Sequence, residues 1–221
     1  MKKSKILFIS GLSLLLALVL TLWLALYLQG SWLSPQQKSS MQEIVKSGEL
    51  SRSYKLMPLS QSQTAENWIL PQYSFQDQNL SKDWISLKDQ VQKEENKSVL
   101  ILFWASWLNE ELVISQLNQL EKLNQKYSSK GISVFSIALD TDMDLFRHQI
   151  ENIHPKIQIS YPILIDTDLS VKKQYQITSF PVYYILDQNG KIRFNYVGSD
   201  PFQFDIAEMI LDQLMLEQSN S

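Results

Sequence analysis

The chain has 221 residues, a formal net charge of −3 and no cysteine. Its apolar fraction of 44% against 19% charged residues is typical of a globular protein rather than a disordered one. The missing cysteines exclude disulfides, thiolate metal sites and cysteine nucleophiles, and the 17 basic against 23 acidic groups beyond residue 30 argue against a protein that binds nucleic acid.

Residues 1–30 predict a transmembrane anchor. Three lysines stand within the first five residues, and an uncharged run then extends from residue 6 to residue 28. As a helix this run is long enough to cross a hydrocarbon core of about 30 Å. The next charge is Lys38, so we expect the N-terminus in the cytoplasm and the rest of the chain outside it, in the periplasm or on the outer face of the inner membrane. The alternative is a cleaved signal peptide, whose apolar region would be shorter and would end in a small-x-small site.

Residues 31–68 are rich in serine and glutamine and predict a tether, and residues 69–221 predict the folded domain. Residues 99–104 form a continuous apolar run, which is typical of a strand buried on both faces of a sheet. We expect Gly131 to end the helix that follows. Asn189-Gly190 predicts a two-residue hairpin turn, because both positions accept a positive φ.

Strands alternate with helices along the domain, and the last two strands form a hairpin. This order predicts a mostly parallel sheet covered by helices on both faces and made mixed by the hairpin. The predicted strands cover residues 73–76, 84–87, 99–104, 132–139, 161–166, 182–186 and 191–197. The predicted helices cover residues 113–127, 142–152 and 170–175, and a last helix begins at Asp200-Pro201.

Three motifs occur in order along this domain. They are Phe-Trp-Ala-Ser-Trp at residues 103–107, Pro-Ile-Leu-Ile-Asp at residues 162–166 and Ser-Phe-Pro at residues 179–181. Together they resemble the thioredoxin superfamily, and within it the TlpA/ResA branch of membrane-anchored thiol–disulfide proteins, over roughly residues 69–216. The resemblance implies a thioredoxin-like three-layer α/β fold with a mixed central sheet, preceded by one transmembrane helix. It also implies a cis peptide bond at Pro181, facing the redox motif.

The chain departs from this branch at the redox motif itself. In the family the first motif is followed by Cys-x-x-Cys at the start of a helix, whereas here Leu108 and Glu111 stand in the two cysteine positions. Dithiol exchange needs a thiolate nucleophile and a resolving thiol, and the chain offers neither. We therefore expect no catalytic residue, cofactor or metal at this motif, and an inherited shape without the inherited activity.

The leading hypothesis is a redox-inactive module that binds or scaffolds a protein partner in the cell envelope. Trp107, Leu108 and Phe180, with Tyr183, would form an apolar patch beside Pro181, and such patches mark partner sites. In the family the backbone beside this proline pairs with an extended segment of the substrate, a form of strand addition. The family links the partner to thiol-redox or cytochrome c maturation machinery. The alternatives are that the aromatic side chains only pack on one another, or that the domain fills an interface in a membrane complex.

The second hypothesis is an enzyme with cysteine-free chemistry at Glu111. It requires this carboxyl group to be partly buried near Pro181, where it would donate or accept a proton. In the simpler interpretation, Glu110 and Glu111 are solvated acids that the N-terminus of the helix favours.

The two histidines and the aspartates at residues 140 and 142 are expected to have structural rather than catalytic roles. We expect His148 and His154 at the surface. We expect Asp140 at the end of a strand and Asp142 as a helix cap.

Overall fold

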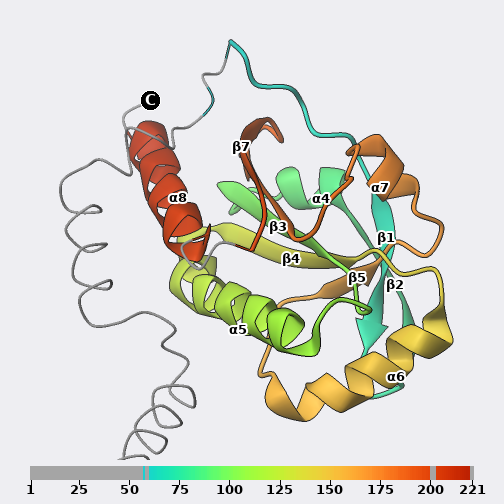
Figure 1. Ribbon diagram of the computed structural model, residues 1–221. Coiled ribbons are helices and arrows are strands. Elements are labelled where there is room, and N and C mark those ends of the chain that lie inside the picture. Colours follow the sequence, from blue (N-terminus) through green and yellow to red (C-terminus); the bar gives the residue numbers. More distant parts are fainter. Residues whose placement is uncertain (1–56, 58–59, 200–202, 220–221) are drawn as a thin grey trace, which may run out of the picture. The chain divides into compact units, whose positions relative to one another are not determined.

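The computed structural model describes Met57, residues 60–199 and residues 203–219 (Figure 1). The anchor predicted at residues 1–30 and the helix start predicted at Asp200-Pro201 lie outside these residues. No helix in the described part of the chain is long and apolar enough to cross a membrane.

A mixed sheet of seven strands forms the centre of the fold, in the order β2-β1-β5-β4-β3-β6-β7. β3 pairs with β4, and β4 with β5, in parallel, whereas the other neighbouring pairs are antiparallel. The mixed sheet predicted from the order of elements is therefore confirmed, but the prediction that it is mostly parallel is wrong. Four of the six neighbouring pairs are antiparallel, because β1 and β6 each join the parallel strands β5, β4 and β3 in the antiparallel sense. The strands are β1 (Ile69–Ser74), β2 (Asn79–Ser86), β3 (Ser98–Trp104), β4 (Ile132–Ala138), β5 (Ile163–Ile165), β6 (Val182–Asp187) and β7 (Ile192–Val197).

β3 lies in the interior of the sheet between β4 and β6, and every one of its residues is buried. Because side chains alternate along a strand, its apolar run supplies both faces of the sheet. Val99, Ile101 and Phe103 belong to one core cluster, whereas Trp104 contacts Phe146 of α6 on the opposite face, with ring centroids 6.2 Å apart.

Helices cover both faces and give three layers (Figure 1). The short helices α4 (Leu87–Val91) and α7 (Ser170–Gln174) lie on the face of the first core cluster. The longer helices cover the opposite face. They are α5 (Glu110–Tyr127), α6 (Met143–Ile153) and α8 (Gln203–Ser219). The short 3₁₀ helix η1 (Ser128–Lys130) follows α5, and η2 (His154–Lys156) follows α6.

Packed structure begins before Ile69, earlier than the predicted boundary. Trp68 is buried, and its ring packs edge-on against Phe135 with centroids 6.0 Å apart. Upstream of it, the amide of Ala65 donates to the carbonyl of Gly190 at 2.8 Å. This bond and the bridge between Thr64 and Lys191 place the tether residues before Trp68 along the β6–β7 hairpin.

The β6–β7 turn differs from the predicted two-residue turn. Four residues separate the strands, and Gly190 has a φ of 71° whereas Asn189 does not adopt a positive φ. The reason is the Asp187 carboxylate, which accepts from the amides of Asn189 (2.9 Å) and Lys191 (3.0 Å) and so stabilises a wider turn.

Two expected element ends are confirmed. Gly131 has a φ of 86° and lies after η1, which continues the turn of α5. Asp142 caps α6, since its Oδ1 accepts from the amides of Asp144 (3.1 Å) and Leu145 (2.9 Å).

Candidate functional site

The altered redox motif lies where β3 ends and α5 begins. The carbonyl of Trp104, the last residue of β3, accepts from the amide of Leu139 at 2.9 Å, which fixes the end of β3 beside the end of β4. Asn109 then caps α5 by accepting from the amide of Leu112 at 3.1 Å. Leu108, half-buried, and Glu111, in the first turn of α5, therefore occupy the positions that the family gives to its two cysteines.

A buried hydrogen-bonded pair, Asp140 and Ser106, fixes the conformation of this loop. The Asp140 carboxylate accepts from the hydroxyl of Ser106 at 2.7 Å and from its amide at 3.0 Å. Burial raises the pKa of Asp140, and the two hydrogen bonds from Ser106 oppose that rise. Asp140 follows the end of β4, as predicted, but its partner was not predicted, because only the parallel pairing of β3 and β4 brings the two residues together.

Phe180 and Trp107 meet beside Pro181. Their rings pack edge-on, with centroids 5.8 Å apart at 89°. Trp107 is 56% exposed, whereas Phe180 is half-buried and packs partly against the core. The Phe180–Pro181 peptide bond is cis, as the resemblance implies. Pro181 itself is buried, so it does not contribute surface as predicted, because its ring is covered by its neighbours. We call the surface formed by Trp107, Leu108 and Phe180 the Trp107–Phe180 face.

Tyr183 does not join this face, which corrects the prediction. Only 1% of its surface is exposed, and its hydroxyl donates to the side chain of Gln116 on α5. Its ring also packs against Phe204 of α8. Because successive side chains of β6 point to opposite faces of the sheet, Tyr183 faces α5 and α8.

The first turn of α5 carries two exposed carboxylates, as in the simpler interpretation of Glu110 and Glu111. Glu110 forms an ion pair with Lys156, the last residue of η2. Glu111 is exposed to solvent, so the burial that the proton-transfer hypothesis requires is absent. The second hypothesis therefore lacks the burial on which it depends.

The remaining polar candidates lie away from the face. His148 and His154 are exposed, as predicted, and the ring of His154 stacks on Phe75 with centroids 4.4 Å apart. Within the described residues no group of three or more histidine, aspartate and glutamate side chains could hold a metal ion.

Comparison with known families identifies the family to which this chain belongs. The model of the AhpC/TSA family matches residues 63–195, which is more than half of the chain. The chain belongs to the AhpC/TSA family. Two curated relatives of this AhpC/TSA chain are the thioredoxin-like protein YneN of Bacillus subtilis and the thiol-disulfide oxidoreductase ResA of Oceanobacillus iheyensis. YneN is 30% identical over 51% of this chain and 63% of its own, and ResA is 24% identical over 53% of this chain and 58% of its own.

Solved structures support the thioredoxin-like fold. A Chlorobium tepidum protein described as a thiol:disulfide interchange protein DsbE superposes with a TM-score of 0.55 at 20% identity, covering 71% of this chain and 95% of its own. AhpC of Enterococcus faecalis also gives a TM-score of 0.55, at 13% identity, covering 71% of this chain and 91% of its own. The family match and the two curated relatives confirm the resemblance to thiol–disulfide proteins. The AhpC/TSA chain differs from proteins that exchange thiols and disulfides in having no cysteine anywhere in its sequence.

Proposed function

We propose that this chain is a redox-inactive member of the AhpC/TSA family that binds a protein partner through the Trp107–Phe180 face. The absence of cysteine removes the nucleophile and the resolving thiol that disulfide exchange requires. What remains at the same place is an apolar surface beside a proline, and such surfaces mark partner sites.

The exposure of Trp107 is the observation that carries this proposal. A tryptophan side chain that is 56% exposed leaves a large apolar area in water, which costs free energy until a partner covers it. Tryptophan is also among the residues that contribute most to protein–protein binding. Phe180, in the loop before β6, packs edge-on against its ring, so the indole is held in place before a partner arrives.

A cationic group lies at the border of this face. The ammonium group of Lys172 on α7 lies 5.6 Å from the centroid of the Phe180 ring. An apolar contact with a lysine at its rim fits a partner segment that places an acidic or carbonyl group beside an apolar side chain.

The setting that we propose is the cell envelope. The uncharged run over residues 6–28 supports an anchor with the domain outside the cytoplasm. ResA is described as a thiol-disulfide oxidoreductase, which supports a partner in thiol-redox machinery. A partner in cytochrome c maturation rests on the resemblance to the TlpA/ResA branch alone. In this proposal the chain holds such a partner and does not oxidise or reduce it.

Photo-crosslinking in native membranes tests the proposal. A benzoylphenylalanine in place of Trp107 should yield a discrete adduct whose partner, identified by mass spectrometry, is an envelope protein. Trp84 on β2 gives a matched control, because it is also tryptophan and is 62% exposed. Adding Leu108→Asp to the position-107 probe should abolish the adduct. The same adducts from both positions, or an adduct that persists with Leu108→Asp, would show that the Trp107–Phe180 face is not the binding surface.

A further inference from the structure

The C-terminal half of β7 is an open strand edge. β7 is the last strand of the sheet, and the amide of Gly198 donates back to the carbonyl of Pro181 at 3.0 Å, so the main chain of Gly198 faces β6. Because successive residues of a strand direct their main-chain groups to opposite edges, those of Asn195 and Val197 point away from β6. Apart from their neighbours in β6, no described residue pairs with these two, and both are exposed to solvent.

The tether covers the other half of the same edge. Thr64 forms an antiparallel bridge with Lys191, and the amide of Ile192 donates to the carbonyl of Gln63 at 2.8 Å. The chain therefore already serves as an additional strand beside the start of β7, and it runs antiparallel to that strand.

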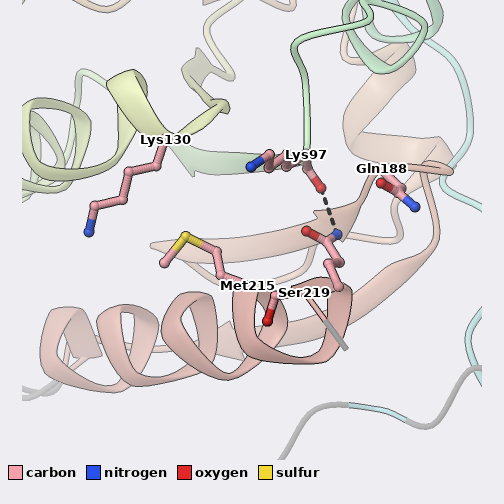
Figure 2. Close-up of a pocket in the computed structure, with 6 residues that line it drawn as sticks. Lys97, Lys130, Gln188, Met215 and Ser219 are labelled. Carbon is pink, nitrogen blue, oxygen red and sulfur yellow. Dashed lines mark hydrogen bonds between the residues drawn. The ribbon is translucent and has the colours of Figure 1, made fainter. Parts of the chain in front are cut away.

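Met57 is a second and firmly held contact with β7. Its amide donates to the carbonyl of Arg193 at 2.7 Å, and its carbonyl accepts from Nε of Arg193 at 2.8 Å. The Arg193 guanidinium also pairs with Glu217 of α8 at 2.7 Å. The last turn of α8 is joined to the start of β3, because the side-chain amide of Gln218 donates to the carbonyl of Lys97 at 2.8 Å (Figure 2). Met57 is thus fixed beside the middle of β7.

The bond between Met57 and Arg193 sets a register for the residues upstream. An amide-to-carbonyl bond across an antiparallel pair places the two residues directly opposite each other. Continued towards the N-terminus, this register places Leu56 opposite Phe194, Lys55 opposite Asn195 and Tyr54 opposite Tyr196.

The side-chain pattern of the upstream segment matches β7 in this register. Along β7, Phe194 is buried and Tyr196 is half-buried, whereas Asn195 between them is exposed. The upstream segment alternates in the same way, with a charged lysine between a tyrosine and a leucine. Apolar side chains therefore meet apolar ones, which is the kind of cross-strand pair that stabilises antiparallel strands. A slip of one residue would place the lysine against the buried face.

We propose that Tyr54–Leu56, which lie outside the described residues, pair with the open edge of β7 and extend the sheet. The amide of Lys55 donates to the carbonyl of Asn195 and the amide of Asn195 to the carbonyl of Lys55, while the amides of Tyr54 and Leu56 face solvent. The occupant is the chain itself, because Lys55 is two residues, or at most about 7 Å, from the fixed Met57.

This added strand has two consequences. It secures the tether to the domain from residue 54 onwards, and it blocks an edge that would otherwise be a template for pairing with another chain. The inference does not depend on a partner at the Trp107–Phe180 face.

Hydrogen exchange of the full chain in detergent, resolved to single amides by electron-transfer fragmentation and mass spectrometry, tests the proposal. The amides of Lys55 and Asn195 should exchange at least about tenfold more slowly than unstructured amides, whereas those of Tyr54 and Leu56 should exchange at the unstructured rate. This alternation is specific to an added strand, since a helix would protect consecutive amides and a coil would protect none.

Variants of the segment identify the strand. Lys55→Pro removes the amide that bonds to Asn195 and should raise exchange at Asn195 to the unstructured rate. Tyr54→Ser with Leu56→Ser removes both apolar pairs and should raise exchange at Asn195 about tenfold. Lys55→Ser is the matched control, because it keeps the main chain and the apolar pairs and should leave Asn195 protected. Amides of β3 should stay protected in every variant, which shows that the domain remains folded.

Two results would overturn the proposal directly. They are exchange of Asn195 at the unstructured rate in the unaltered chain, and protection of Asn195 that is unchanged in Lys55→Pro. If that remaining protection increased with protein concentration, the open edge of β7 would belong to a second copy of the chain instead.

Discussion

At the scale of single residues, Asp140 and Ser106 show how the loop of the former redox motif keeps its shape. Both oxygens of the Asp140 carboxylate accept hydrogen bonds from Ser106, and only 4% of the residue is exposed. The sequence predicts that Asp140 ends a strand, since it follows an apolar run. It cannot predict the partner, because no local spacing relates residues 34 positions apart.

We expect the stabilising effect of Asp140 to depend on pH. Burial raises its pKa in the folded state above the ordinary value of about 3.9 for the unfolded chain. Between these two values the folded chain keeps a proton that the unfolded chain has lost. The free energy of unfolding therefore falls as pH rises through the window, by about 1.4 kcal/mol for each unit by which the pKa is raised.

The variant Asp140→Asn isolates this effect, because asparagine does not titrate. We expect the free energy of unfolding of the unaltered chain, minus that of the variant, to decrease as pH rises from about 4 towards neutral and then to level off. Urea denaturation at several pH values measures both. A difference that is constant with pH would mean that Asp140 has the same pKa in both states.

At the scale of elements, Arg193 joins three segments that are far apart in sequence. Its guanidinium contacts Asp187 at the β6–β7 turn and Glu217 on α8, and its Nε donates to the carbonyl of Met57 at 2.8 Å. Met57 in turn donates from its amide to the carbonyl of Arg193 at 2.7 Å. An arginine in a strand of alternating pattern gives no sequence signal for this role, since exposed arginines are common in such strands.

Removal of this guanidinium should destabilise the domain and loosen the segment that precedes it. We expect Arg193→Met to lower the free energy of unfolding by about 3 kcal/mol, because Asp187 is left buried with no cation. The amides of Met57 and Ala65 should also exchange hydrogen faster. Denaturation and hydrogen exchange with mass spectrometry check the two effects.

Arg193→Lys is the matched control, since it keeps the charge but not the planar group that reaches three acceptors. It should recover only part of the stability. If the methionine variant were as stable as the unaltered chain, the ion pairs of Arg193 would contribute nothing net.

The elements themselves divide into those that sequence predicts and those that it does not. β3 is predicted because an uninterrupted apolar run suits a strand with two buried faces, and Asp142 because a cap acts within its own turn. The β6–β7 turn is predicted in place but not in type, because the side chain of Asp187 rather than the Asn-Gly pair sets its width. The burial of Tyr183 against α5 and α8 is not predicted, because the apolar run of β6 does not show which of its alternating residues face those helices.

At the scale of the whole molecule, the fold does not depend on the chemistry that its family performs. The core is apolar on both faces of the sheet and includes no thiol, so loss of the cysteines removes a reaction without removing a structural contact. The candidate face could be predicted from the sequence as a set of residues, since the motifs fix Trp107 and Phe180. The solvent exposure of Trp107 could not be predicted, because it depends on how α5, α7 and β6 pack against one another.

If the scaffold has kept the geometry of its relatives, two substitutions should restore dithiol chemistry. Leu108→Cys with Glu111→Cys places two thiols three positions apart, with two residues between them, around a helix start that Asn109 already caps. The helix N-terminus lowers the pKa of the first thiol, which raises its thiolate fraction near neutral pH about tenfold. The oxidised double variant should therefore lose two hydrogens in intact mass and, once reduced, should reduce insulin disulfides about tenfold faster than Leu108→Cys alone. A double variant that forms no intrachain disulfide under oxidant would mean that the loop between β3 and α5 has diverged in shape as well as in sequence. The loop would then have been shaped by partner recognition at the Trp107–Phe180 face and would no longer hold two side chains at the separation that disulfide exchange requires.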